Sequence, residues 1–286
     1  MQGWLIVNSF MNTDKFHNLY EMLSLAFKKH NVELIVKKVS DISLEIGVNI
    51  ENKPDFAIFW DKDIYLAERL EKSGVRLFNN KSAIMLCDNK ILMYQALKEN
   101  GIRIPRTFVA PKTFEGLDYC DRSFLEKVIK EIGFPMVVKE AYGSFGEQVY
   151  LANDEESLNK IIDSIGYKDF LMQEYISSSK GKDIRINVVG EQAIVSMLRE
   201  NDNDFRSNIS NGGHGSIYQP NPEFIDLALE ASKALGLDFA GVDVMFGEDG
   251  PIICEVNSNP QFASTLNATG VNLADYIADY IIKKHD

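Results

Sequence analysis

Residues 239–257 read FAGVDVMFGEDGPIICEVN and form the most informative segment of the chain. Two apolar runs flank the turn Gly247 to Gly250, so the segment predicts an antiparallel hairpin. The turn brings Asp243 and Glu255 nearly opposite each other, and Asn257 shares the face of Glu255 because strand side chains alternate. Two carboxylates this close in an apolar sheet repel each other unless a cation lies between them, and oxygen ligands select Mg²⁺ or Mn²⁺. We therefore interpret these three residues as metal ligands rather than as solvent-exposed groups.

A polar strand is predicted upstream of this hairpin. Asp183, Arg185 and Asn187 alternate along residues 183–189, which places all three on one face. A face of this kind is either solvated or lines a cleft, and the pattern alone leaves both interpretations open.

The segment between these strands is rich in guanidinium groups and glycines. Arg199 and Arg206 can each hold a phosphate or carboxylate bidentately, and Asn208 adds a neutral donor. His214 lies between glycines in Asn211 to Gly215. We interpret it as an exposed loop residue, with proton transfer as the alternative.

A glycine loop between two strands marks a candidate phosphate site. Residues 134–152 predict two strands joined by the loop Gly143 to Gly146, whose backbone N–H groups can cradle phosphate oxygens. An ordinary hairpin turn is the alternative, and the P-loop pattern GxxxxGK[ST] is absent. Lys139 lies in the first strand among apolar residues, where burial is costly without an anionic partner.

Other elements frame this loop. Asp88 is the expected N-cap of a helix from Asn89 to Asn100. Lys90 lies in its first turn and, taken alone, is interpreted as a solvated surface lysine. A helix is expected at Glu155 to Ile165, followed by a strand and hinge at Phe170 to Ile176.

The first eighty residues alternate strand-like and helix-like segments. Strands are expected at Trp4 to Asn8, Val32 to Val39 and Asp55 to Trp60, with a helix at Asp14 to His30. A small βαβ unit follows from this order. Because no GxGxxG follows the first strand, an NAD-type role is not expected.

Composition excludes several classes of protein. The formal charge of −12 argues against nucleic-acid and anionic-membrane partners. No apolar stretch reaches the length of a membrane span and no signal peptide is recognised, so we expect a cytoplasmic chain. The three cysteines are too scattered for a disulfide framework or a zinc site.

The ordered motifs together resemble an ATP-grasp ligase, most closely the RimK-like group. They are Lys90, Pro-x-Val-x-Lys ending at Lys139, GSFG at 143–146, Gln-Glu-Tyr-Ile at 173–176, Asp-Ile-Arg at 183–185, Asp-Phe-Arg-Ser-Asn at 204–208, Ala-Gly-Val-Asp at 240–243 and Glu-Val-Asn at 255–257. The resemblance implies an α/β (α+β) fold in three parts: a pre-grasp domain at 1–87, a central subdomain with the lid loop at 88–176, and a C-terminal subdomain with the magnesium site at 177–286.

The resemblance also implies roles for single residues. Nucleotide contacts fall on Lys90, Lys139, Gly143, Ser144, Gly146, Glu174, Tyr175, Ile176, Asp183, Arg206, Ser207 and Asn208. Arg185, Arg199 and Arg206 are the expected catalytic side chains, and Asp243, Glu255 and Asn257 the ligands of Mg²⁺ or Mn²⁺, with two ions expected. The implied reaction joins a carboxylate to an amine through an acyl phosphate, with ADP as a product.

The substrates are not specified by this resemblance. After the metal motif the chain continues Asn259 to Thr265, where RimK-like ligases of ribosomal protein typically have a Pro-Gly segment. The expected partners are an amino acid and a carboxylate acceptor that is a small molecule, a peptide or a protein tail, and a homo-oligomer is possible. A non-catalytic ATP-binding regulatory or scaffold protein is the alternative, and the intact metal motif favours a ligase. A kinase that stops at the phosphorylated carboxylate is a third possibility.

Overall fold

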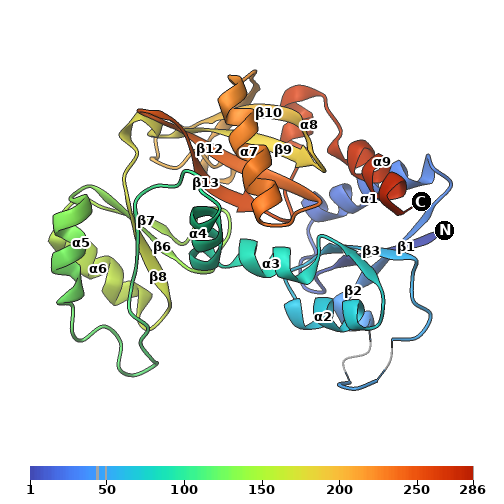
Figure 1. Ribbon diagram of the computed structural model, residues 1–286, viewed down its shortest axis with the longest axis horizontal. Helices are drawn as coiled ribbons and strands as arrows, with labels where there is room; N and C mark the ends of the chain where they lie inside the picture. Colours follow the sequence, from blue (N-terminus) through green and yellow to red (C-terminus); the bar gives the residue numbers. More distant parts are fainter. Residues whose placement is uncertain (43–44, 49, 286) are drawn as a thin grey trace.

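The computed structural model describes residues 1–42, 45–48 and 50–285. In this part of the chain three sheets follow one another along the sequence, and helices pack against each of them (Figure 1). The mixture of parallel and antiparallel sheets confirms the predicted α/β (α+β) class.

The first sheet is parallel and has the strand order β2-β1-β3-β4. Its residues alternate between two apolar layers, because Leu5 and Val7 pack with α1 and α9 whereas Trp4 and Ile6 pack with α2 and α3. Burial on both faces explains the continuous apolar runs in the sequence. The predicted βαβ arrangement is confirmed, with elements β1 (Gln2–Val7), α1 (Asp14–Lys28), β2 (Glu33–Lys38), η1 (Val39–Asp41), β3 (Phe56–Trp60), α2 (Ile64–Lys72), β4 (Arg76–Phe78) and α3 (Lys81–Asp88).

The second sheet is antiparallel and has the order β5-β8-β6-β7. Helices α5 and α6 cover one of its faces, where they meet Met136 and Val138. Because strand residues alternate, Val137 and Lys139 point to the opposite face. The elements are α4 (Lys90–Glu99), β5 (Thr107–Val109), α5 (Phe124–Ile132), β6 (Met136–Glu140), β7 (Val149–Ala152), α6 (Glu155–Ile165) and β8 (Phe170–Glu174).

The third sheet is antiparallel, with the order β11-β10-β9-β12-β13. Helices α4 and α7 bury its apolar face, including Ile184 and Val242. Its other face carries the alternating polar residues of β9. The elements are η2 (Ser177–Ser179), β9 (Lys182–Val189), β10 (Gln192–Glu200), η3 (Ile209–Asn211), β11 (His214–Ile217), α7 (Pro222–Ala234), β12 (Phe239–Gly247), β13 (Gly250–Asn257), α8 (Ala263–Thr269) and α9 (Leu273–His285).

A bulge in the β12–β13 hairpin aligns its acidic residues. The pairing of Gly247 with Gly250 would by itself place Asp243 opposite Cys254, but the register shifts by one residue and Asp243 pairs with Glu255. A shift of one residue turns a side chain to the other face of a sheet, and bulges commonly re-aim side chains next to active sites. The hairpin and its turn are confirmed, and the bulge makes the near opposition of the two carboxylates direct.

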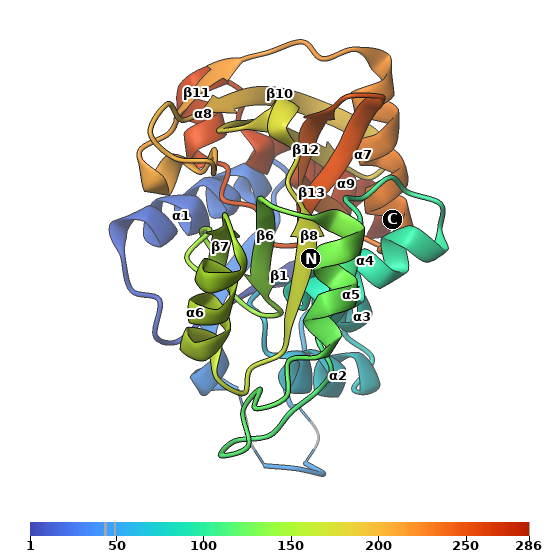
Figure 2. The same cartoon turned by 90° about the vertical axis from the view of Figure 1, so that its left-hand side faces the viewer.

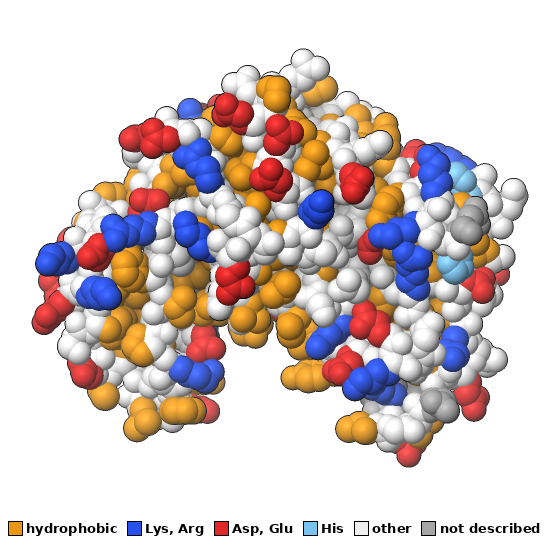
Figure 3. Space-filling view, in the orientation of Figure 1, with side chains coloured by type: hydrophobic (Ala, Val, Ile, Leu, Met, Phe, Trp, Pro, Cys, Tyr) orange, Lys and Arg blue, Asp and Glu red, His pale blue; other side chains and the backbone are white. Residues whose placement is uncertain are grey.

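The first and third sheets are joined by specific contacts. The Trp60 ring stacks on Phe239 with 5.3 Å between centroids. The Asn79 side chain donates to the carbonyls of Phe239 at 2.9 Å and Ser258 at 2.8 Å, and it accepts from the Asp238 amide at 2.6 Å. These contacts hold the carboxyl end of β3 beside the segment that follows β13. Figure 3 shows the notch that separates the lobe carrying β1–β4 from the lobe carrying β5–β8.

Helix ends agree with the sequence in one case and differ in the other. Asp154 caps α6 through the Ser157 amide at 2.7 Å, and Gly166 follows the helix with φ 66°, as predicted. The expected cap at Asp88 is wrong, because Asn89 accepts from the first-turn amides of α4 and Asp88 ends α3. The three domain ranges stay a prediction.

Candidate functional site

A first cavity lies between the second and third sheets, whose strands face each other in Figure 2. Lys139 reaches into it from β6 and is 7% exposed, and its Nζ donates to the Tyr94 hydroxyl at 2.8 Å. Burial raises the pKa of Tyr94 to about 12, so this partner is a neutral phenol. Among the described residues no carboxylate forms an ion pair with Lys139. A buried ammonium with a neutral partner is suited to an anionic ligand.

Lys90 lines the same cavity. Its interpretation from the sequence as a solvated surface lysine is wrong. The side chain is 6% exposed, and Nζ donates to the Gly143 carbonyl at 3.0 Å and lies 3.6 Å from a Glu255 carboxylate oxygen. Its backbone amide donates to the Ala141 carbonyl at 2.8 Å. The position of Lys90 in the first turn of α4 therefore serves contacts with the glycine loop and with β13, not with solvent.

The loop Gly143 to Gly146 closes one side of the cavity and depends on its glycines. Gly143 has φ +146° and Gly146 has φ +76°, a region that favours glycine. A Cβ on Gly146 would lie 2.8 Å from the Asn208 side-chain oxygen. Ser144 is exposed, and its hydroxyl accepts from Lys62 Nζ at 3.3 Å. The glycine loop thus approaches Asn208 on one side and contacts Lys62, which follows β3, on the other.

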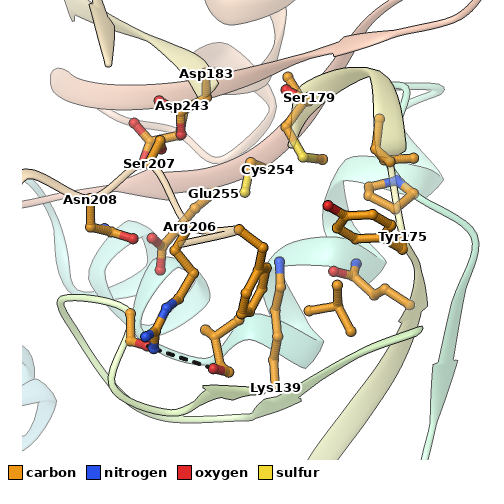
Figure 4. A pocket seen from close by; sticks show the side chains of 18 of the residues that line it. Lys139, Tyr175, Ser179, Asp183, Arg206, Ser207, Asn208, Asp243, Cys254 and Glu255 are labelled. Atoms are coloured by element: carbon orange, nitrogen blue, oxygen red, sulfur yellow. Dashed lines mark hydrogen bonds between the residues drawn. The ribbon is translucent and has the colours of Figure 1, made fainter. Parts of the chain in front are cut away.

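Arg206 joins the two walls of the cavity. Its Nη1 donates to the Gly146 carbonyl at 2.6 Å, and its Nη2 lies 2.7 Å from Asp204. Ser207 and Asn208 follow on the same cavity. In Figure 4, Lys139 lies on the opposite side of the cavity from Asp183 and Asp243, with Arg206 and Glu255 between them. Arg206 therefore contacts the glycine loop directly.

The other end of the cavity is less charged. Glu174, Tyr175 and Ile176 line it where β8 ends, and the Glu174 side chain accepts from the Arg106 amide at 2.8 Å. Val137 and Met245 also line the cavity and were missed in the sequence. The alternation of strand side chains could have identified them, because Val137 lies two positions from Lys139 and Met245 lies two positions from Asp243.

Four charged residues form a buried network on the polar face of the third sheet. Asp183 accepts from Arg199 at 2.7 and 2.5 Å, Asp243 lies 2.9 Å from Arg199, and Arg185 also forms a bidentate pair with Asp243. Burial alone would raise the pKa of Asp243, but the two arginines outweigh it and lower that pKa. The polar face of β9 thus belongs to a cleft and is not solvated. Asn187, which is fully buried, lies next to this network.

A second cavity of about 480 Å³ adjoins the first. Its size lies within the range of about 300–1,000 Å³ found for small-molecule sites. Both cavities are lined by Gly143, Ser144, Arg199, Asn208 and Glu255. These shared residues mark the place where a group on one ligand can meet a second ligand.

The end of the first sheet supplies part of the second cavity, which the sequence did not predict. Asn8 follows β1, and Trp60, Asp61 and Lys62 lie at the end of β3. In open parallel sheets, ligands bind beyond the carboxyl ends of strands where the strand order reverses, and the order β2-β1-β3-β4 reverses between β1 and β3. Polar residues directly after the apolar run 56–60 were the signal that could have identified this edge.

A family model described as the RimK-like ATP-grasp domain matches residues 87–281. The chain belongs to the RimK-like ATP-grasp family. The match begins within two residues of the end of α3 and extends into α9, so it includes both walls of the first cavity.

Relatives and solved structures agree with this membership. The chain is 33% identical over 272 residues to an uncharacterized protein of Mycoplasma pneumoniae, with 93% of this chain and 94% of that protein covered. It is 37% identical to human N-acetylaspartylglutamate synthase A over 77% of this chain and 56% of that protein, so the match spans little more than half of the human enzyme. It is 36% identical to a probable alpha-L-glutamate ligase of Methanococcoides burtonii over 75% of this chain and 70% of that protein.

The fold is also that of solved ATP-grasp proteins. A RimK domain ATP-grasp protein of Sphaerobacter thermophilus has a TM-score of 0.76 at 21% identity, with 98% of this chain and 99% of that chain covered. D-alanine–D-alanine ligase of Bacillus anthracis complexed with ATP has a TM-score of 0.73 at 19% identity, with 100% and 97% covered. The predicted ATP-grasp fold and the predicted class of ADP-forming C–N ligases are confirmed.

ATP use is inherent to the ATP-grasp family, and Mg²⁺ is typical of it. The buried Lys139 and Lys90 fit the phosphates of a nucleotide, as described above. For the metal, Glu255 lies directly across from Asp243, and Asn257 lies two positions further on the same face. Two carboxylates and an amide fit Mg²⁺, which usually keeps few protein ligands and takes phosphate oxygens and water for the rest.

The paired carboxylates have protein cations as counter-charges. The sequence predicted that a metal ion compensates the paired carboxylates, but Arg185 and Arg199 compensate Asp243, and Lys90 approaches Glu255. No cluster of three or more His, Cys, Asp or Glu able to hold a metal occurs in residues 1–42, 45–48 and 50–285. The ligand assignment of Asp243, Glu255 and Asn257 stays a prediction.

Two further expectations concern the surface. His214 lies in the edge strand β11, 65% exposed, 3.8 Å from Glu200, and it lines neither of the two cavities described. The predicted exposure of His214 is confirmed, but its predicted place in a loop is wrong, because it begins strand β11. Within the described ranges, no helix is long and apolar enough to cross a membrane.

Proposed function

We propose that this chain uses Mg²⁺-ATP to join a carboxylate to the amine of an amino acid, and that the amino acid is L-glutamate. The observation that carries the nucleotide site is the buried Lys139, whose ammonium donates to the neutral Tyr94 hydroxyl and forms no ion pair with a carboxylate among the described residues. Glutamate is suggested by the names of the human synthase and of the archaeal ligase, which both contain it.

The two cavities fit the two halves of the reaction. In the first half, a carboxylate oxygen attacks the γ-phosphorus of ATP and ADP leaves. We assign Lys90, Lys139 and Arg206 to the phosphates, because they surround the glycine loop. In the second half, the substrate ammonium gives one proton to water, and the neutral amine nitrogen attacks the acyl carbon. The bond between the acyl carbon and the phosphate oxygen breaks, and a second proton passes from the nitrogen to water or to the leaving phosphate. Both reactants of this step belong in the second cavity.

The buried network of arginines and aspartates holds Arg199 in place for the reaction. Arg199 lines both cavities and is held by Asp183 and Asp243. A guanidinium fixed in this way needs no reorganisation when negative charge develops between the cavities. Arg185 lines only the second cavity of the two and is assigned to the carboxylate substrate. When bound, Mg²⁺ would neutralise phosphate charge; Asp243, Glu255 and Asn257 would hold it, and we propose two ions.

Trapping the activated carboxylate tests this function. The purified chain is incubated with Mg²⁺-ATP and L-glutamate against a panel of carboxylates that includes N-acetyl-L-aspartate and citrate, and ADP release is measured. With the productive carboxylate, hydroxylamine in place of glutamate should yield an acyl-hydroxamate with one ADP per acyl group. ADP release without any hydroxamate would refute the acyl phosphate. A chain that binds ATP and shows no turnover with any pair would instead support the regulatory alternative.

A further inference from the structure

Three residues that line the second cavity each carry a side-chain oxygen with no hydrogen-bond partner among the described residues. These oxygens are Asp61 Oδ2, Asn259 Oδ1 and Gln261 Oε1, and each atom is buried. A buried acceptor without a hydrogen bond costs free energy, so several such acceptors in the lining of one cavity indicate a ligand that donates hydrogen bonds.

Asp61 is the charged member of this group and is held rigidly. Its side chain is 7% exposed, and its Oδ1 accepts from the backbone amides of Lys62 at 2.6 Å and Asp63 at 2.8 Å. These bonds fix the carboxylate at the end of β3 and leave Oδ2 unused. Lys62, which directly follows Asp61 in the chain, pairs with Asp88 at 2.5 Å instead. Within the described residues, no Lys, Arg or His forms an ion pair with Asp61.

The two amide oxygens belong to the segment after β13. Asn259 Nδ2 donates to the Asp61 backbone carbonyl at 3.1 Å, which holds the Asn259 side chain beside the end of β3. Gln261 follows two positions later and lines the same cavity. This segment is also the one that departs from the ribosomal-protein RimK pattern, so it is suited to determine substrate choice.

We propose that Asp61, Asn259 and Gln261 form the site that binds the α-ammonium group of the amine substrate. This inference rests on the proposed function and names the recognition element for its amine. An ammonium group offers three N–H donors and one positive charge, and the site offers three acceptors and one negative charge. A divalent metal ion is the poorer match, because one carboxylate leaves it undercompensated.

Asp61→Asn tests the site without removing its framework. The new amide keeps an oxygen for the amides of Lys62 and Asp63, and the substitution removes a buried charge that has no ion-pair partner among the described residues. We therefore expect a urea midpoint no lower than that of the wild type. Asp63→Asn is the matched control, since it removes a charge two residues away and keeps an N-cap side chain for α2.

Calorimetry with L-glutamate and glutarate, in the presence of Mg²⁺ and a non-hydrolysable ATP analogue, measures the contribution of the amine. The two molecules differ by the amine alone. Wild type and Asp63→Asn should prefer glutamate by at least about tenfold, the scale of a charged hydrogen bond, whereas Asp61→Asn should lose this preference. Hydroxamate formation from the neutral hydroxylamine should stay within about threefold of wild type in both variants.

Three results overturn the inference. The first is that Asp61→Asn keeps the preference for glutamate, the second that it weakens glutamate and glutarate binding equally, and the third that it loses hydroxamate formation in parallel with glutamate use. Equal binding of glutamate and glutarate by the wild type also refutes it, while hydroxamate formation would show that the acyl-phosphate chemistry stands. If the wild type uses another amino acid, the glutamate assignment fails, and the same comparison with that amino acid and its deaminated analogue decides the role of Asp61.

Discussion

Replacing Lys139 by methionine separates the stability of the empty protein from its affinity for nucleotide. Lys139 is buried in β6 between apolar residues, and its Nζ interacts with the Tyr94 hydroxyl and lies 5.2 Å from the centre of the Tyr94 ring. Methionine has a similar length and no charge. The Tyr94 hydroxyl keeps its own acceptor, the Cys254 carbonyl, so the substitution leaves no donor unsatisfied.

The two effects have opposite signs. Burial of a charge costs several kcal/mol, and a hydrogen bond from a charged group returns about 1.5–3 kcal/mol. Removal of the charge should therefore raise the unfolding free energy of the nucleotide-free protein by about 1–2 kcal/mol. Loss of one charge-assisted contact to phosphate should weaken Mg²⁺-ATP binding by about 2 kcal/mol, or about 30-fold in Kd.

Urea unfolding of the empty protein and calorimetry with Mg²⁺-ATP measure the two quantities. Lys160→Met is the control, because Lys160 lies on α6 in a surface pair with Glu156 and is 73% exposed. A surface pair contributes about 0–1 kcal/mol, so this variant should change neither quantity much. If Lys139→Met lowers stability and leaves the Kd for Mg²⁺-ATP unchanged, Lys139 is a structural residue and the nucleotide assignment of this cavity is wrong.

Three other outcomes are expected from the geometry. Gly146→Ala should slow turnover at least about tenfold, since the added Cβ would lie 2.8 Å from a side-chain oxygen of the facing loop; Gly116→Ala, which has a similar positive φ and open space around it, should leave turnover near wild type. Asp243→Asn should lower the urea-derived unfolding free energy by about 3 kcal/mol, because Arg185 stays buried without its charge partner, and a wild-type value would contradict the network. Burial raises the pKa of the Cys254 thiol to about 11, so at pH 8 it is protonated and iodoacetamide should modify the exposed Cys120 first; mass spectrometry showing faster modification of Cys254 would contradict this.

Local patterns were sufficient for the elements of the chain. The hairpin at 239–257, the cap of α6 at Asp154 and the parallel first unit all follow from apolar periodicity and from turn and cap residues, which act between neighbours in sequence. The ordered motifs likewise pointed to the ATP-grasp family, because their spacing reflects one particular arrangement of strands and loops.

Contacts between segments that are distant in the sequence could not be predicted from local patterns. Lys90 looked like a surface residue because the sequence does not show that β13 and the glycine loop enclose it. Similarly, a metal ion was expected as the counter-charge of Asp243, whereas the partners are Arg185 on β9 and Arg199 on β10. Which cation neutralises a buried carboxylate depends on strand order and register.

The sequence by itself determined the family, the strands and the side chains available for chemistry, because these depend on local pattern and on motif order. Only the tertiary structure decided which of them meet. The bulge at Cys254 turns Glu255 to the face of Asp243, since a single extra residue reverses the side of a strand on which a side chain lies. Docking of the first sheet on β12 brings Asp61 to Asn259, and that contact joins positions 198 residues apart in the chain.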